Sequence, residues 1–255
     1  MIRCTVLVML CALCACNAPF MGNDTPVAAN VDTLDTPPYT ITASPEIFEK
    51  AFFKNSTAVF KGRDSMRFFQ LNMGSLHIET GKIVAADIVN MHDMPAFTQQ
   101  FPKGRFPVIL SVARFPHGDE RIAFSQVLLS PDSIVRWEYA LRKDQPPASI
   151  FSDTFYSYGV DAGIGLFMDE KANQAFTSLS GDDPKAFDKY IMKPLNDQHH
   201  VTWEYALQDF NGGNMAIFST GFGDGHYATY IGFNNAGEPC RLLTDFGIVD
   251  WWKKR

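Results

Sequence analysis

A glycine-rich stretch at residues 221–227, "GFGDGHY", contains the residue types best suited to chemistry. The Asp224 carboxylate suits a cation or an amine, and the His226 imidazole can move a proton near neutral pH. Glycines let the backbone approach a ligand closely, so the expected binding residues are Gly223, Asp224, Gly225 and Tyr227. The same letters also predict a tight turn between strands, in which Asp224 accepts hydrogen bonds from backbone amides. The stretch therefore indicates either a site or a turn.

A second glycine-rich stretch, "GVDAGIGLF" at residues 159–167, contributes Asp161. Together with Asp224 and His226, this carboxylate completes a set of acid/base candidates for hydrolysis. The acidic residues lack the alternating spacing of a calcium loop, and no two histidines lie four residues apart. We therefore expect no metal site and no cofactor.

Two motifs near the C-terminus have simpler explanations. Asp245-Phe-Gly247 resembles the magnesium-binding motif of protein kinases, but the glycine loop, strand lysine and catalytic loop of kinases are missing. We interpret it as the end of a strand. The final residues 251–255, "WWKKR", could lie at a lipid headgroup layer. We favour one tryptophan packed against a sheet, followed by a solvated basic tail.

The N-terminus carries the pattern of an export signal. Residues 1–15 contain one positive charge followed by an apolar run too short to span a bilayer as a mature helix. Residues 13–16, "LCAC", resemble the bacterial lipobox, in which the final cysteine receives lipid. We expect a lipoprotein signal peptide over 1–15 and acylation of Cys16, which would anchor the protein to a membrane. Ordinary cleavage and secretion is the alternative.

The rest of the chain divides into a tether and a domain. Residues 16–42 are rich in Pro, Asn, Asp and Thr without periodicity, so we expect a flexible tether. Residues 43–255 are long enough for one globular domain, which must rely on a hydrophobic core because Cys240 would be its only free cysteine. The net charge of −6 and the dispersed acidic residues make nucleic acid an unsuitable partner.

The periodicity predicts an α+β fold dominated by antiparallel sheet with a few short helices. Strand-like segments rich in β-branched and aromatic residues fill 66–141 and return after residue 201. Thr80-Gly81 indicates a tight hairpin. Helices are expected at Ser44 to Lys54, at Asp169 to Ser178 and at Pro184 to Asn196.

The pentapeptide "WEYAL" occurs twice, at Trp137 to Leu141 and at Trp203 to Leu207. In a strand, alternation places Trp, Tyr and Leu on one face and Glu and Ala on the other. We expect both tryptophans to be buried in sheets and both glutamates to be more exposed. Because a glycine-rich stretch follows each copy, the repeat is consistent with duplication into two pseudo-symmetric lobes. Two similar core environments explain it as well.

Several of these stretches resemble the bacterial domain of unknown function 4241 family. The similarity rests on "GSLHIETGKIVAAD", "FPKGRFPVILSVA", "RWEYAL", "YGVDAGIGLFMD" and "FSTGFGDGHYATYIGFNNAGEPCRLLTDF", which occur in the family's order over roughly residues 70 to 250. The resemblance implies a shared fold. It supplies no reaction, cofactor or catalytic residue.

Two classes of function follow from these observations. The first is a lipid-anchored envelope protein that binds a partner without catalysis, for example a periplasmic antitoxin against a neighbour's effector. Asn17 after the lipidated cysteine indicates the periplasmic face of an outer membrane. The second is an envelope hydrolase that uses Asp224, His226 and Asp161.

Overall fold

The computed structural model describes residues 40–60 and 64–255, all of which belong to one compact unit. The expected signal peptide, Cys16 and most of the expected tether lie outside the described residues. Within them, the fold is mostly antiparallel β-sheet with a few short helices, as the sequence predicts.

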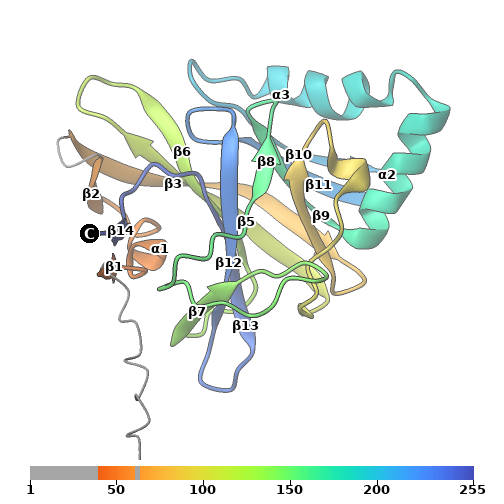
Figure 1. The fold of residues 1–255 in the computed structure, drawn as a ribbon. Coiled ribbons are helices and arrows are strands. Elements are labelled where there is room, and N and C mark those ends of the chain that lie inside the picture. The colour runs from red at the N-terminus through yellow and green to blue at the C-terminus, as the bar shows by residue number, and fades with distance from the viewer. Residues whose placement is uncertain (1–39, 61–63) are drawn as a thin grey trace, which may run out of the picture. The chain divides into compact units, whose positions relative to one another are not determined.

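The larger sheet has eight strands and curls into a half-barrel (Figure 1). In spatial order its strands are β2 (Thr57–Phe60), β3 (Asp64–Ile78), β5 (Gly104–Arg114), β6 (Glu120–Leu128), β13 (Pro239–Asp245), β12 (Gly225–Phe233) and β7 (Arg136–Tyr139), while β8 (Tyr158–Val160) also pairs with β12. Register shifts that indicate β-bulges interrupt the pairing of β3 with β5, of β5 with β6 and of β12 with β13. Bulges bend strands and increase their twist, which fits the curl of the sheet.

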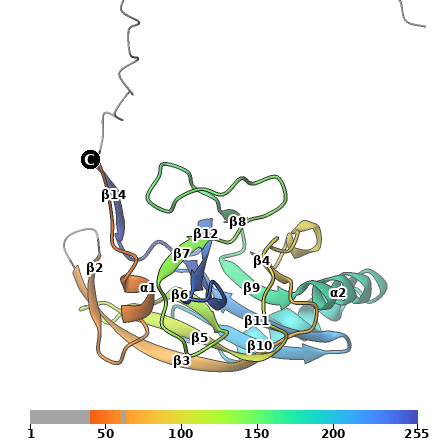
Figure 2. The same ribbon diagram turned by 90° about the horizontal axis from the view of Figure 1, so that it is seen from below.

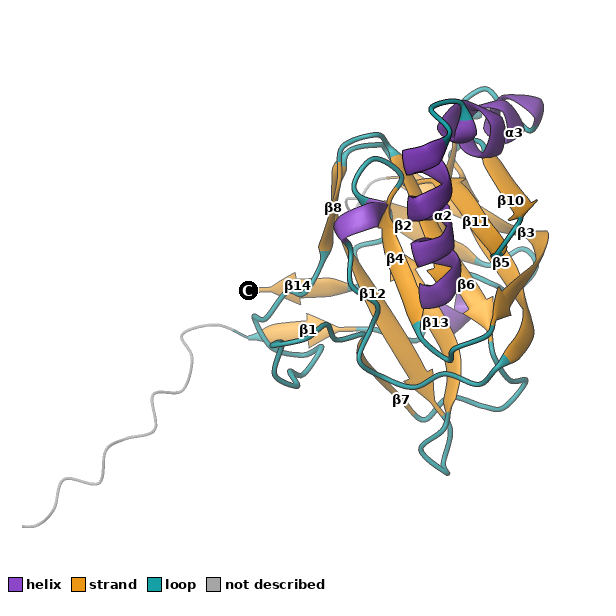
Figure 3. Cartoon of the chain, turned by 90° about the vertical axis from the view of Figure 1, so that its right-hand side faces the viewer, coloured by secondary structure: helices purple, strands orange, loops and turns teal. Residues whose placement is uncertain are grey.

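The smaller sheet has four strands and carries the helices. Its order is β10 (Tyr205–Phe210), β11 (Gly213–Ser219), β9 (Ile164–Asp169) and β4 (Ile83–Asp87). Figure 3 shows α2 lying across this sheet. The helical segments are η1 (Met91–Asp93), α2 (Glu170–Asp182), the π-helical η2 (Asp188–Met192) and α3 (Lys193–Asp197). None of the helices in the described part of the chain is long and apolar enough to cross a membrane.

The hairpin predicted at Thr80-Gly81 is wrong, because this turn joins two different sheets. β3 pairs with β2 and β5, whereas β4 pairs with β9. The buried Asp169 carboxylate accepts hydrogen bonds from the backbone amides of Glu79 and Thr80, at 3.0 and 2.9 Å. It also caps α2 by accepting from the amide of Lys171 at 2.9 Å. Asp169 thus fixes the crossing from one sheet to the other.

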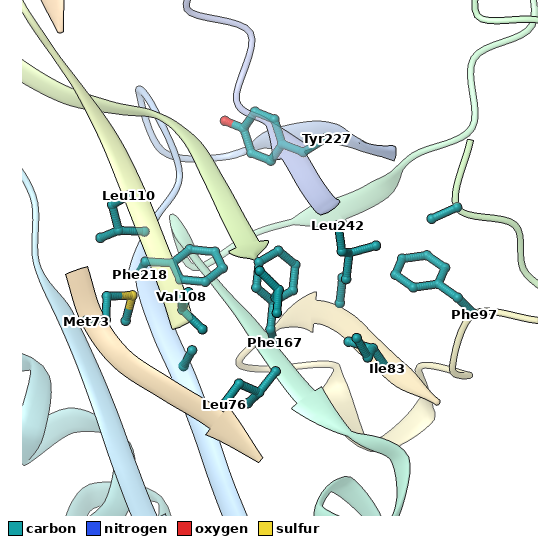
Figure 4. Close-up of a cluster of buried hydrophobic side chains, with 14 of the residues drawn as sticks. Met73, Leu76, Ile83, Phe97, Val108, Leu110, Phe167, Phe218, Tyr227 and Leu242 are labelled. Atoms are coloured by element: carbon teal, nitrogen blue, oxygen red, sulfur yellow. The ribbon is translucent and has the colours of Figure 1, made fainter. Parts of the chain in front are cut away.

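Apolar side chains fill three layers. Between the two sheets, Phe167 and Phe218 of the smaller sheet meet Val108 and Leu242 of the larger one (Figure 4). A second layer packs the smaller sheet against α2, with Phe176 fully buried. A third covers the outer face of the larger sheet and includes residues from α1 (Ile47–Lys50), β12 and the C-terminal segment.

The two ends of the described chain pair with each other. β1 (Ile41–Ala43) runs antiparallel to β14 (Trp252–Lys254), so strand structure begins two residues before the predicted domain start at residue 43. The helix expected from Ser44 to Lys54 is much shorter, since α1 spans only Ile47–Lys50. Its Phe48 ring is fully buried and stacks on Tyr230 at 5.0 Å.

The repeated pentapeptide lies on edge strands of different sheets. In both copies Trp, Tyr and Leu pack on one side and Ala on the other, which confirms the predicted alternation. Trp203 is 3% exposed but precedes β10, whereas Trp137 lies within β7 and is only partly buried. β7 pairs with the distant β12, while β10 pairs with β11, the next strand. Because the strand pairings do not repeat, similar packing explains the pentapeptide better than two pseudo-symmetric lobes.

Candidate functional site

Strand pairing brings the two predicted glycine-rich stretches side by side. β8 runs antiparallel to the first residues of β12, which places Val160 opposite Gly225 and Gly159 opposite His226. Asp161 and Asp224 continue from these two strands at the same end, so they are neighbours. Both carboxylates and the His226 ring are exposed. The three acid/base candidates therefore gather on one surface, although 62 or more residues separate Asp161 from the others in sequence.

Tyr227 holds the turn that contains Asp224. Its hydroxyl donates to the carbonyl of Gly223 at 2.6 Å and to that of Thr220 at 3.2 Å, and its ring is buried. The Thr220 hydroxyl donates to the same Gly223 carbonyl at 2.8 Å. Among the described residues none donates a hydrogen bond to the Asp224 carboxylate. The prediction that Asp224 bonds backbone amides to hold the turn is therefore wrong, because the buried tyrosine does this from the neighbouring strand.

Asp87 holds the turn that contains Asp161. This fully buried carboxylate accepts hydrogen bonds from the backbone amides of Asp161 and Ala162, the second at 3.0 Å, and from that of Val89 at 2.9 Å. In the described part of the chain, no group of three or more His, Cys, Asp or Glu side chains is arranged to hold a metal ion. The glycine-rich surface thus presents solvated acid/base groups on two rigid turns.

A cavity of about 570 Å³ lies elsewhere, between β7, β12 and the C-terminal segment, and we call it the aromatic pocket. Five rings line it, from Tyr139, Phe155, Tyr230, Trp251 and Trp252. Its polar lining residues are Asp153, Thr154, Asp245 and Lys254. Mostly apolar cavities of this size with a few polar groups are typical binding sites for small molecules. The aromatic pocket is therefore the stronger structural candidate.

The loop between β7 and β8 forms one wall of the aromatic pocket. Both strands pair with β12, β7 with its second half and β8 with its first, so the intervening residues 140–157 are forced out of the sheet (Figure 2). The Tyr139 hydroxyl donates to the carbonyl of Thr154 at 2.8 Å and ties this loop down. Loops this long in a compact domain usually serve a function. A second cavity of about 410 Å³ lies between β7 and residues 147–151 of the loop and shares Tyr139.

Asp245 is the carboxyl group that ends β13 inside the aromatic pocket. The Trp251 indole N–H donates to its Oδ2 at 2.6 Å, and the backbone amide of Gly247 donates to its Oδ1 at 2.9 Å. Burial raises the pKa of Asp245 to about 6, and these two hydrogen bonds only partly oppose the effect. Among the described residues, no Lys, Arg or His forms an ion pair with it. Asp245 can therefore be either charged or neutral near physiological pH.

The remaining polar groups of the aromatic pocket have defined states. Burial raises the pKa values of Tyr139 and Tyr230 above their ordinary value, so both hydroxyls stay protonated at neutral pH. Lys254 forms an ion pair with Asp153 at 2.9 Å, which links β14 to the loop. The pocket is thus built from five separate parts of the chain: β7, the following loop, β12, β13 and the C-terminal segment.

The sequence contained some of these residues without indicating their role. Asp245 does end a strand, and Trp251 does pack against the larger sheet, as predicted. What the sequence missed is that they bond to each other and meet Tyr139 from the first "WEYAL" copy. The one local signal was an acidic residue at a strand end followed six residues later by two tryptophans.

Comparison with known proteins identifies the family and nothing more specific. No curated protein and no solved structure matches the chain. A family described as "Protein of unknown function (DUF4241)" matches residues 76–244. The match includes Tyr139, Thr154 and Tyr230 but ends one residue before Asp245. Since it covers most of the chain, the protein belongs to the DUF4241 family.

Proposed function

We propose that the protein is a lipid-anchored, non-enzymatic binding protein of the bacterial cell envelope, and that the aromatic pocket is its binding site. The observation that carries this proposal is a cavity of about 570 Å³ lined by five aromatic rings together with the half-buried carboxyl group of Asp245. Aromatic rings supply large contact areas at low conformational cost, which favours binding. The residues that line the pocket include no serine, cysteine or histidine to serve as a nucleophile with its base.

The expected lipid on Cys16 would place the aromatic pocket near the membrane end of the domain. β14 lines the pocket and pairs with β1, the first described strand, which lies where the expected tether ends. If fully extended, the chain from Cys16 to Thr40 would reach up to roughly 80 Å. The tether would thus let the pocket sample the space next to the anchoring membrane, which we expect to be the periplasmic face of an outer membrane.

Exposed aromatic side chains on the loop favour a protein partner as one version of this function. Phe155, which lines the pocket, is 59% exposed, and Phe151 of the same loop is 53% exposed. Exposed aromatic groups of this kind are enriched at protein interfaces. One concrete version is a periplasmic antitoxin that shields the cell from a neighbour's effector.

Affinity capture from envelope extract tests the proposal. The lipid-free protein serves as bait, with Phe155→Ser as the pocket variant and Phe222→Ser as its matched control. Phe222 is 53% exposed and lies on the glycine-rich turn instead. We expect the partner to be captured by the wild type and by Phe222→Ser but lost with Phe155→Ser. The reverse result would place binding at the glycine-rich turn.

An envelope hydrolase that uses Asp224, His226 and Asp161 is the second candidate. It is favoured by the pairing of β8 with β12, which gathers the three side chains on one surface. Release of soluble fragments from envelope material would measure this activity. If His226→Ala and Asp224→Asn fold normally and abolish a release that the wild type shows, the hydrolase replaces the binding protein.

A further inference from the structure

The rings that line the aromatic pocket pack against one another at several angles. Tyr139 and Tyr230 lie 5.1 Å apart between centroids, and the Trp251 ring stands perpendicular to Tyr230 at 5.6 Å. Trp252 and Phe155 add two further rings to the lining. A positive charge is attracted to the face of such rings within about 6 Å of the centroid, with Trp the strongest of them. Their arrangement around one cavity is therefore suited to a cation.

The charges that line the aromatic pocket also favour a cation. Within residues 40–60 and 64–255, the hydrogen-bond donors to Asp245 are both neutral, the Trp251 indole and the Gly247 amide. The Lys254 ammonium is paired with Asp153 at the rim. Two carboxylates and one ammonium group therefore line the cavity, which leaves an excess of negative charge when Asp245 is ionised. Removing a carboxylate from water without a counter-charge raises its free energy, and a bound cation would lower that free energy again.

We propose that the aromatic pocket binds a small ligand through an ammonium group, either quaternary or a protonated amine, with Asp245 as its counter-charge. This inference rests on the proposed function only in taking the pocket as the binding site. An anionic ligand would face the Asp245 carboxylate directly. A neutral apolar ligand would displace water from that carboxylate without offering it a hydrogen bond or a charge. Of the three ligand classes, only a cation stabilises the ionised form of Asp245.

Binding should depend on pH through Asp245. The Trp251 indole bonds to its carboxyl group, and the hydroxyls of Tyr227 and Tyr230 interact with it electrostatically. Tyr139 and the ion pair of Lys254 with Asp153 line the same pocket. Burial raises the pKa of Asp245 to about 6, so the carboxylate loses its charge as the pH falls through this value. The affinity of the pocket for a permanent cation should therefore fall over the same pH range. The tyrosine hydroxyls, whose pKa values are raised, keep the same state throughout.

Choline and its uncharged carbon isostere dimethylbutanol form a matched pair of probes, because they have nearly the same shape. Each is titrated into the purified protein by calorimetry, at one pH well above and one well below the pKa of Asp245. Above it, we expect choline to bind at least about tenfold more tightly than dimethylbutanol. Asp245→Asn should reduce this difference, because the aromatic rings remain but the counter-charge is lost. The matched control Asp250→Asn, which removes an exposed carboxylate near the same end of the chain, should keep it.

Three results would overturn the inference: equal binding of the two probes, no binding of choline, or unchanged choline binding by Asp245→Asn.

Trp251→Phe gives an independent check, because losing the indole N–H should raise the pKa of Asp245 further. The pH midpoint of choline binding should then move upward. If choline shows no preference but capture still depends on Phe155, the ligand class is wrong and the binding site stands. If Phe155→Ser captures the same partner as the wild type while choline binds as expected, the proposed function is wrong and the ligand class stands.

Discussion

At the scale of single residues, Asp245 stands out because its position opposes stability. The two buried carboxylates of the described residues, Asp169 and Asp87, each accept several backbone hydrogen bonds. Asp245 accepts two hydrogen bonds, and burial still raises its pKa to about 6. A group that lowers stability in its ionised form while it lines a cavity is typical of a functional site.

Replacing Asp245 by Asn should stabilise the protein in a pH-dependent way. The pKa of Asp245 is higher in the folded protein than in the unfolded chain, so the folded state binds the proton more tightly. The wild type therefore loses stability as the pH rises from about 4 through about 6. At pH 8 the variant should be more stable by about 1–3 kcal/mol, after allowance for partial solvent access, and at pH 4 the two should be alike.

Urea unfolding of the wild type and of Asp245→Asn at these two pH values measures the effect. Asp250→Asn is the control, since this exposed residue should show no such difference between the two pH values. A stability change in Asp245→Asn that is the same at both pH values would show that ionisation of Asp245 does not destabilise the fold.

At the scale of elements, β12 organises both candidate sites. Its first half pairs with β8 and supports the glycine-rich turns, and its second half pairs with β7 beside the aromatic pocket. Tyr227 and Tyr230 point to opposite faces of this strand, Tyr227 into the layer between the sheets and Tyr230 into the layer beneath α1. One strand thus anchors a turn on one face and a pocket on the other.

The turn between β11 and β12 should depend on Tyr227 more than on Asp224. Tyr227→Phe removes the hydroxyl that donates to the carbonyls of Gly223 and Thr220, which should lower the free energy of unfolding by about 1 kcal/mol. Asp224→Ala removes an exposed carboxylate without a hydrogen bond from the described residues, so its effect should stay within about 0.5 kcal/mol. Thermal unfolding compares the two variants. A larger loss with Asp224→Ala would restore the turn-holding role that the sequence predicted for it.

At the scale of the whole molecule, the proposed lipid anchor would determine where the proposed binding site operates. β1 and β14 pair at the ends of the described chain, and β14 lines the aromatic pocket. An anchor attached through the tether at β1 would therefore keep the pocket within the tether's reach of the membrane. This location suits capture of a ligand or effector that arrives at the membrane surface.

Replacing Cys16 by Ser should release the protein from membrane fractions and abolish fatty-acid labelling. Cys240→Ala is the control, because Cys240 is fully buried and is the one other cysteine left after the expected cleavage. It should leave membrane association unchanged. If Cys16→Ser still sediments with membranes as the wild type does, the lipoprotein interpretation is wrong.

The sequence by itself determined the fold class and the local behaviour of most elements. Alternation of apolar residues predicted the antiparallel strands, and in both "WEYAL" copies it predicted which side chains share a face. Such features depend on residues close together in the chain, so a periodic pattern is enough to reveal them. The family resemblance also followed from the sequence, through motifs that keep their order.

Only the tertiary structure decided which strands are neighbours and therefore where the sites lie. Thr80-Gly81 has the residue types of a hairpin turn. The turn instead connects the two sheets, and Asp169, 89 residues away in sequence, holds it there by hydrogen bonds. The aromatic pocket likewise joins Tyr139, Tyr230 and Trp251, which meet because β12 pairs with β7 and the C-terminal segment folds back onto the sheet. No local sequence pattern predicts these contacts, because long-range strand pairing depends on the packing of the whole core and not on the strand propensity of any one segment.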